Sequence, residues 1–159
     1  MIILYSILIL LAVFILITLI RAIFFKAPPV KKEEFPEETV NEKRAADNLS
    51  EAIKIKTVSH EDESLTDWNE FERFHAFLRK AYPKVHSTME ITKISKASLL
   101  FKWQGTDDSL DPIAFLAHQD VVPVSKGTYD DWTHPAFDGY NDGEFVWGRG
   151  ALDMKNHLI

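Results

Sequence analysis

The chain has 159 residues, of which 46% are hydrophobic and 26% are charged, a composition typical of a folded domain rather than of a disordered segment. The formal net charge is -6 at pH 7 and the Lys and Arg residues do not cluster densely, so no nucleic-acid partner is expected. The chain has no cysteine, which excludes a disulfide framework and a thiolate metal site and leaves His, Asp and Glu as candidate metal ligands.

Residues 1–25 form a strongly apolar segment with no charge, Pro or Gly before Arg21. A bilayer core takes about 20 apolar residues in a helix, so this segment is predicted to be a single-pass membrane anchor. A cleaved signal peptide is the alternative, but the apolar run is long, no basic residue precedes it, and no small-x-small cleavage site stands before Lys26. The basic residues Arg21, Lys26, Lys31 and Lys32 all follow the helix. By the positive-inside rule, this favours a cytoplasmic location for the downstream domain. The opposite side of the membrane stays open as the alternative.

Residues 26–38 are rich in Pro and charge and show no apolar period, which predicts a solvated linker. A folded domain is expected over residues 39–159. Its first helix is predicted over residues 39–55, because apolar residues recur on one face and Thr39 stands three positions before Glu42, the spacing of a capping box.

A second helix is predicted over residues 66–83, where Thr66 or Asp67 can cap the first turn and Pro83 ends the last. Large apolar side chains recur in it at steps of three or four, at Trp68, Phe71, Phe74, Leu78 and Ala81. Such a stripe is typical of a helix that packs on the core of a domain. His75 lies beside the stripe and is expected to be half-buried.

Three strands are predicted next, over residues 85–94, 98–105 and 113–118, with a turn-forming segment between the last two. The last of these strands is a continuous apolar run, which favours a sheet covered on both faces. A further short strand is expected over residues 144–150, and residues 151–159 are expected to enter a helix. Two helices followed by strands of this kind predict the start of a layered α/β domain.

The apolar run ends in His118, Gln119 and Asp120, which places an imidazole and a carboxylate two residues apart. In open α/β sheets, ligands bind beyond the carboxyl ends of the strands. Neutral imidazole is a good zinc ligand, and a nearby carboxylate that accepts its other ring proton holds it in the correct tautomer. The alternative is an ordinary turn or a surface hydrogen bond, which a lone His-x-Asp forms more often.

The sequence GRGALDMKN, residues 148–156, places Asp153 after two glycines and at the entrance of the expected last helix. Gly148 and Gly150 allow a close approach of the backbone. A simple interpretation of Asp153 is a helix cap. A carboxylate held in this way is also suited to bridge two metal ions, as in hydrolases whose ions lie roughly 3.5–4 Å apart and share a water molecule.

Three stretches together, LAHQDVVPV, WTHPAF and DGEFVWGRGALDMKN, resemble in order, spacing and residue type the di-zinc metallopeptidase family of carboxypeptidase S, the aminoacylases and succinyl-diaminopimelate desuccinylase. The resemblance is specific over residues 113–157 and diffuse over residues 39–112, where IKIKTVSH resembles the family's early helix-to-loop segment. Asn156 and the amino-terminal apolar segment favour the branch of carboxypeptidase S and the N-acyl-amino-acid hydrolases.

The resemblance implies that His118 is a ligand of one zinc ion, that Asp120 is the catalytic-site acid that orients it, and that Asp153 bridges two zinc ions. It also implies an α/β catalytic domain with a mostly parallel central sheet, of which residues 39–159 are the incomplete amino-terminal part. The family's inserted lid domain, through which members often dimerise, is expected to be absent from this chain. The general-base Glu, its paired ligand Glu and the remaining ligands are expected beyond Ile159, so the fragment alone is expected to be inactive.

The implied activity is hydrolysis of an amide bond in a dipeptide or an N-acyl amino acid by a membrane-anchored zinc metallopeptidase or amidohydrolase. Two zinc ions would polarise the scissile carbonyl and activate a bridging water. The alternative is a membrane-tethered binding module of the same fold without catalysis. Arg149 is expected to support the glycine-rich loop rather than to bind a substrate carboxylate. The other histidines stand at no ligand spacing and are expected in surface or core roles: His60, His86, His134 and His157.

Overall fold

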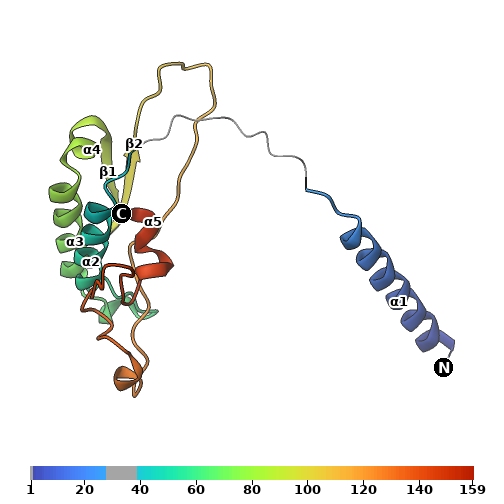
Figure 1. Ribbon diagram of the computed structural model, residues 1–159. Helices are drawn as coiled ribbons and strands as arrows, with labels where there is room; N and C mark the ends of the chain where they lie inside the picture. The colour runs from blue at the N-terminus through green and yellow to red at the C-terminus, as the bar shows by residue number, and fades with distance from the viewer. Residues whose placement is uncertain (1, 28–38) are drawn as a thin grey trace. The chain divides into compact units, whose positions relative to one another are not determined.

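The computed structural model describes residues 2–27 and 39–159 (Figure 1). These residues form two units that divide after Thr39, one helical and one of mixed helices and strands. The linker predicted over residues 26–38 lies outside the described residues from position 28 to position 38, and so do Lys31 and Lys32.

The first unit is the helix α1 (Ile2–Ile23), whose 22 residues expose apolar side chains all round. Its most apolar window has a mean hydropathy of 3.1, and the helix is long enough to span a bilayer. The hydroxyls of Ser6 and Thr18 donate to the carbonyls of Ile2 and Phe14 one turn earlier, so they need no water partner in apolar surroundings. A signal sequence has the same length and composition, so α1 fits both predicted alternatives.

In the second unit, helix α2 (Glu42–Lys54) begins after Asn41, whose side-chain oxygen accepts the main-chain N–H of Arg44 at 2.9 Å. The cap predicted at Thr39 is therefore wrong by two residues. The physical reason is that the Asn41 side chain already satisfies the third helical N–H, which leaves Thr39 outside the first turn. The inner face of α2 buries Ser50, Ala52 and Ile53.

Helix α3 (Trp68–Ala81) confirms the second predicted helix. Its cap is Asp67, whose side chain accepts the N–H of Asn69 at 3.0 Å. The apolar stripe of α3 packs against α2 in a core made by Ala52, Ile55, Phe74 and Leu78. His75 is buried rather than half-buried, with 6% of its surface exposed.

Pro83 follows the end of α3 as predicted, but it also opens helix α4 (Pro83–Thr88), because proline suits the first position of a helix. The first four residues of the strand predicted over 85–94 therefore lie in α4. The remainder forms β1 (Glu90–Ile94), which pairs antiparallel with β2 (Ser98–Lys102) as a hairpin. This pair is the one sheet in the part of the chain that the structure describes.

The strand predicted over residues 113–118 is not formed. These residues adopt no regular structure, and Phe115 and Leu116 are 93% and 89% exposed. A covered strand requires hydrogen-bonded neighbours on both sides and side chains over both faces, and residues 2–27 and 39–159 provide neither. The predicted parallel central sheet is accordingly not found among them. A single parallel bridge joins Val58 to Val121 just beyond the apolar run.

The short strand predicted over residues 144–150 is reduced to one antiparallel bridge between Asn141 and Val146. Two single turns of tighter helix lie in the connecting segments, η1 (Glu63–Leu65) and η2 (Tyr129–Asp131). The residues between β2 and the carboxyl terminus therefore run mostly as loops, and their positions depend on hydrogen bonds to the helices.

The helix expected from residue 151 is delayed. Ala151–Lys155 (η3) forms an irregular turn in which Asp153 and Met154 have non-helical backbone angles and are joined by a cis peptide bond. Helix α5 (Asn156–Leu158) follows, with Lys155 and not Asp153 in the capping position. The helix-cap interpretation of Asp153 is therefore excluded, and its carboxylate is available for other contacts.

Candidate functional site

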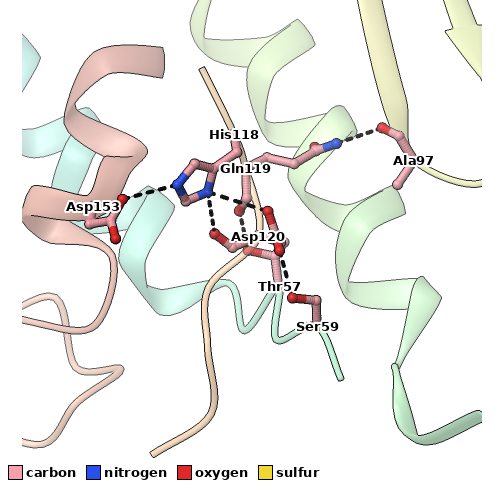
Figure 2. Close-up of polar contacts among 7 residues, drawn as sticks. All are labelled: Thr57, Ser59, Ala97, His118, Gln119, Asp120 and Asp153. Atoms are coloured by element: carbon pink, nitrogen blue, oxygen red, sulfur yellow. Dashed lines mark hydrogen bonds and ion pairs between the residues drawn. The ribbon is translucent and has the colours of Figure 1, made fainter. Parts of the chain in front are cut away.

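The loop of residues 118–120 is pinned to the segment that follows α2 (Figure 2). The N–H of Val121 donates to the carbonyl of Thr57 at 2.9 Å, and the N–H of Ser59 donates to the carbonyl of Val121 at 3.1 Å. The Thr57 hydroxyl also donates to the main-chain carbonyl of Gln119 at 2.6 Å. These bonds fix the main chain where the predicted site residues stand.

His118 contacts both of the other predicted site residues. Its Nε2 lies 3.0 Å from Oδ1 of Asp153, which is 35 positions later in the chain. Its Nδ1 lies 2.9 Å from the main-chain carbonyl oxygen of Asp120 and 3.3 Å from Oδ1 of the same residue. The structure therefore brings together all three residues that the sequence singled out, as Figure 2 shows.

The two ring nitrogens of His118 have different partners, and these partners determine which nitrogen carries the proton in the neutral ring. A carbonyl oxygen only accepts, so Nδ1 must donate its N–H to the Asp120 carbonyl. In a neutral ring, Nε2 then carries a lone pair that faces the lone pairs of the Asp153 carboxylate. The contact is favourable when the two atoms share a cation, which can be a second proton or a metal ion.

The pKa of the His118 imidazole lies above its ordinary value. Burial acts to lower this pKa, but the hydrogen bonds to the Asp153 carboxylate and the Asp120 carbonyl, together with both carboxylate charges, outweigh burial. Without a metal ion, the ring therefore holds its second proton more strongly than an ordinary histidine side chain does.

Asp120 is oriented by a residue that the motifs did not single out. The Ser59 hydroxyl donates to Oδ2 of Asp120 at 2.5 Å, while Oδ1 of Asp120 faces Nδ1 of His118. One carboxylate thus connects the loop after α2 to the imidazole. Ser59 lies in the stretch IKIKTVSH, whose family resemblance was the signal available for it.

The Gln119 side chain points away from those of its two neighbours, as expected for the middle residue of an extended segment (Figure 2). Its Oε1 lies 3.0 Å from Nε2 of His75 on α3, and its Nε2 donates to the carbonyl of Ala97 at 2.5 Å. These contacts anchor the loop on the side opposite to the candidate site. His75 therefore has a structural partner in the domain core.

The three site residues line a hollow of about 210 Å³ that Trp132 and Arg149 also line. The guanidinium carbon of Arg149 lies 5.1 Å from the ring centroid of Trp132, which fits the structural role expected of this arginine. Its Nε is buried and has no hydrogen-bond partner within the described residues. A larger hollow of about 340 Å³ lies beside it against Trp132, Trp147 and His134, but none of the three site residues lines it.

Two of the remaining histidines contact aromatic rings, and neither lines the hollow of His118, Asp120 and Asp153. The His86 ring stands edge-on to Phe101 with 5.5 Å between ring centroids. The His134 ring stacks on Tyr140 with 4.0 Å between ring centroids. Packing accounts for the positions of both imidazoles.

The donor set of the candidate site fits part of a zinc centre. Two ligand atoms bound tetrahedrally to one zinc ion at about 2.0–2.2 Å lie roughly 3.3–3.6 Å apart, a few tenths of an ångström more than the 3.0 Å between Nε2 of His118 and Oδ1 of Asp153. A zinc-binding His commonly donates its other N–H to a carbonyl or carboxylate, as Nδ1 does to Asp120. Over residues 2–27 and 39–159, no group of three or more His, Cys, Asp or Glu side chains has metal-binding spacing. These residues thus offer two ligands, fewer than a firm site uses.

Comparison with known proteins gives several relatives. The chain is 38% identical over 120 residues to carboxypeptidase S of Saccharomyces cerevisiae, covering 71% of this chain and 21% of the relative. It is 38% identical over 123 residues to a carboxypeptidase S-like protein of Dictyostelium discoideum, covering 76% and 23%. It is 40% identical over 130 residues to the N-fatty-acyl-amino acid synthase/hydrolase of Mus musculus, covering 78% and 25%.

The chain therefore spans between a fifth and about a quarter of the length of these curated relatives. No protein-family model and no solved structure matches the chain. The similarity to the curated relatives covers most of the second unit, in which the candidate site lies.

Proposed function

Because this chain belongs to the family of carboxypeptidase S and the N-fatty-acyl-amino acid synthase/hydrolases, we propose that a protein containing it hydrolyses an amide bond in a dipeptide or an N-acyl amino acid. The observation that carries the proposal is the convergence of His118, Asp120 and Asp153 on one hollow, from two segments far apart in the chain. The names of the relatives, a carboxypeptidase and an acyl-amino acid hydrolase, support both substrate classes.

In the proposed site, His118 would be a ligand of one zinc ion and Asp153 the carboxylate shared by two. When bound, zinc would polarise the scissile carbonyl and lower the pKa of an attacking water molecule. Asp120 keeps the N–H of His118 on Nδ1, so that the lone pair of Nε2 is directed toward Asp153. The Asp153 side chain is 87% exposed, which leaves it accessible to ions and substrate.

The proposed reaction requires further ligands and a general base, which the family resemblance assigns to a Glu pair and a His in later sequence. It also assigns a lid domain, through which the protein would form a homodimer. The apolar run 113–118 supports a larger layered fold in the complete protein. Phe115 in this run is 93% exposed. Further strands and helices that cover the extended segment would remove such apolar side chains from water and stabilise it. In that fold these residues would form a strand of a mostly parallel sheet.

Helix α1 supports attachment of the protein to a membrane as a single-pass anchor. Its length and exposed apolar surface suit a bilayer core, and its last turn carries Arg21. The positive-inside rule favours a cytoplasmic catalytic domain. A cleaved signal peptide is the competing assignment for the same helix, and the two predict different amino termini for the mature protein.

The test is hydrolysis of a panel of dipeptides and N-acyl amino acids by the full-length protein, before and after chelation and with zinc restored. His118→Ala and Asp153→Ala are each expected to abolish measurable hydrolysis and to lower the zinc content found by elemental analysis, because each removes a ligand. His157→Ala is the matched control, since its imidazole is exposed on α5 and is expected to be dispensable.

Full activity in either ligand variant would contradict the assignment of the site. A folded protein that binds no zinc and hydrolyses neither substrate class would instead support the membrane-tethered binding module. The two functions are thus separated by one set of measurements.

A further inference from the structure

The Lys155 side chain is fully buried, with 0% of its surface exposed. Its Nζ donates to the main-chain carbonyls of Ala52 and Ile55, each at 2.7 Å, at the carboxyl end of α2. Nζ also lies 5.0 Å from the ring centroid of Phe74 in the core. A buried amino group is costly unless its N–H groups are bonded, and the two carbonyls accept two of the three N–H groups that Lys155 carries when it is protonated. The position of the Lys155 side chain is therefore specific.

The turn before Lys155 exposes two of its side chains. Leu152 and the side chain of Asp153 are 84% and 87% exposed, and the backbone at Asp153 and Met154 is not helical. The N–H of Lys155 donates to the carbonyl of Gly150 at 2.9 Å, which closes the turn. Lys155 is thus the buried anchor that directly follows an exposed candidate ligand.

Residues 52–59, at and after the end of α2, also hold the loop that carries His118 and Asp120. Two hydroxyl side chains of this stretch bond to the loop that carries His118 and Asp120. Lys155 ties the turn that carries Asp153 to carbonyls at the start of the same stretch. The separation of the two candidate ligands therefore depends on one short segment.

We propose that Lys155 is a positioning residue, which sets the carboxylate of Asp153 against His118 by anchoring its turn to the end of α2. The inference rests on the proposed function, in which these two side chains bind metal. A lysine that only caps α2 would affect stability and leave the metal site unchanged, so the two roles predict different measurements.

Lys155→Met tests the proposal in the full-length protein, because methionine is similar in length and has no N–H donor. Leu78→Ala is the matched control, since Leu78 belongs to the same core cluster as Phe74 and is expected to affect stability alone. Co²⁺ is titrated as a spectroscopic probe of the zinc site, at a temperature where circular dichroism shows that both variants are folded. Amide hydrogen exchange over residues 151–155 is measured on the metal-free protein.

Lys155→Met is expected to weaken Co²⁺ binding by about 10–100-fold, the usual effect of losing a residue that orients a ligand. It is also expected to alter the visible absorption of bound Co²⁺ and to speed hydrogen exchange over residues 151–155. Leu78→Ala is expected to lower the melting temperature without these changes. If the unmodified protein binds Co²⁺ and Lys155→Met binds it equally well, the inference is overturned.

Failure of the proposed function is visible separately. If the unmodified protein binds neither Co²⁺ nor Zn²⁺, that function is rejected, and hydrogen exchange alone decides the role of Lys155. Faster exchange confined to residues 151–155 then supports positioning, and unchanged exchange overturns it. If Lys155→Met does not fold, Lys155→Gln replaces it, because glutamine keeps N–H donors for the buried site but is one bond shorter and holds the two carbonyls less firmly, and the same outcomes apply.

Discussion

Nε2 of His118 and Oδ1 of Asp153 lie 3.0 Å apart, although 35 positions separate the two residues. His118 lies in a loop and Asp153 in an irregular turn. Both are held by hydrogen bonds to the segment that ends α2 and follows it. The geometry of the candidate site should therefore respond most to changes in these hydrogen bonds and in close backbone contacts.

The imidazole of His118 is expected to titrate above the ordinary value of about 6.5 in the metal-free protein, because its contacts with Asp153 and Asp120 outweigh burial. A pKa raised by folding means that protonated His118 stabilises the native state. This contribution is complete below the unfolded-state pKa and is lost as the pH rises through the folded-state pKa. Asp153→Asn should lower the His118 pKa, measured by NMR titration of the ring protons after chelation.

The control is Asp107→Asn, because the Asp107 carboxylate contacts Ser109 and takes no part in the contacts of His118, so this substitution should leave the His118 pKa unchanged. An Asp153→Asn protein in which His118 titrates as in the unmodified protein would contradict the contact. Zinc competes with the proton on Nε2, so zinc affinity should rise with pH through the His118 pKa.

Ser59→Ala is expected to leave the Asp120 carboxylate without its fixed hydroxyl partner. The free energy of unfolding should fall by about 1 kcal/mol for the lost hydrogen bond, and metal affinity should fall by less than in His118→Ala. The control is Ser109→Ala, which removes a hydroxyl that donates to the exposed Asp107 at 2.7 Å. Urea denaturation and Co²⁺ titration measure both effects. Equal metal affinity in the two serine variants would show that Ser59 does not orient Asp120.

Gly150 and Gly127 separate backbone strain from close packing, because their φ angles are nearly the same, 85° and 87°. A Cβ at Gly150 would lie 2.5 Å from Cγ1 of Val121, whereas nothing lies within 4 Å of a Cβ at Gly127. Both alanine variants should lose about 1–2 kcal/mol of stability to backbone strain. Gly150→Ala should lose about 1–3 kcal/mol more to overpacking and should displace the turn that carries Asp153.

Urea denaturation compares the two glycine variants, and Co²⁺ titration shows whether the site moves. Equal losses of stability in both variants, with unchanged metal affinity in Gly150→Ala, would contradict the close contact with Val121.

The contrast between α3 and residues 113–118 shows which parts of the fold the sequence could predict. Helix α3 follows from its own apolar spacing and from Asp67 at its start. A covered strand depends instead on partners from elsewhere in the chain, and the described residues offer none to the run 113–118. The predicted cap of α2 was wrong for a local reason. Thr39 and Asn41 are both good capping residues, and the helix begins directly after Asn41.

The candidate site divides in the same way. His118, Asp120 and Asp153 could be singled out because their residue types, at the ends of recognisable segments, carry chemical meaning. Lys155 and Ser59 could not, because their roles depend on long-range contacts. The hydrogen bond from Lys155 to the carbonyl of residue 52 spans 103 positions, and a lysine after Asp-Met has no local feature that indicates burial.

Helix α1 is expected to keep the protein in the membrane, and Val13→Arg tests this at the middle of the helix. Arginine there costs about 2.5–3.5 kcal/mol on insertion scales, whereas each Ile, Leu, Phe or Val of the helix contributes only about 0.3–0.6 kcal/mol, so a larger share of the variant than of the unmodified protein should leave the carbonate-resistant membrane fraction for the soluble fraction. Ile23→Arg is the control, because a long basic side chain at a helix end reaches the polar interface. The mass of the amino terminus distinguishes an anchor, which is retained, from a signal peptide, which is removed. A mature protein that lacks residues 1–25 would contradict the anchor.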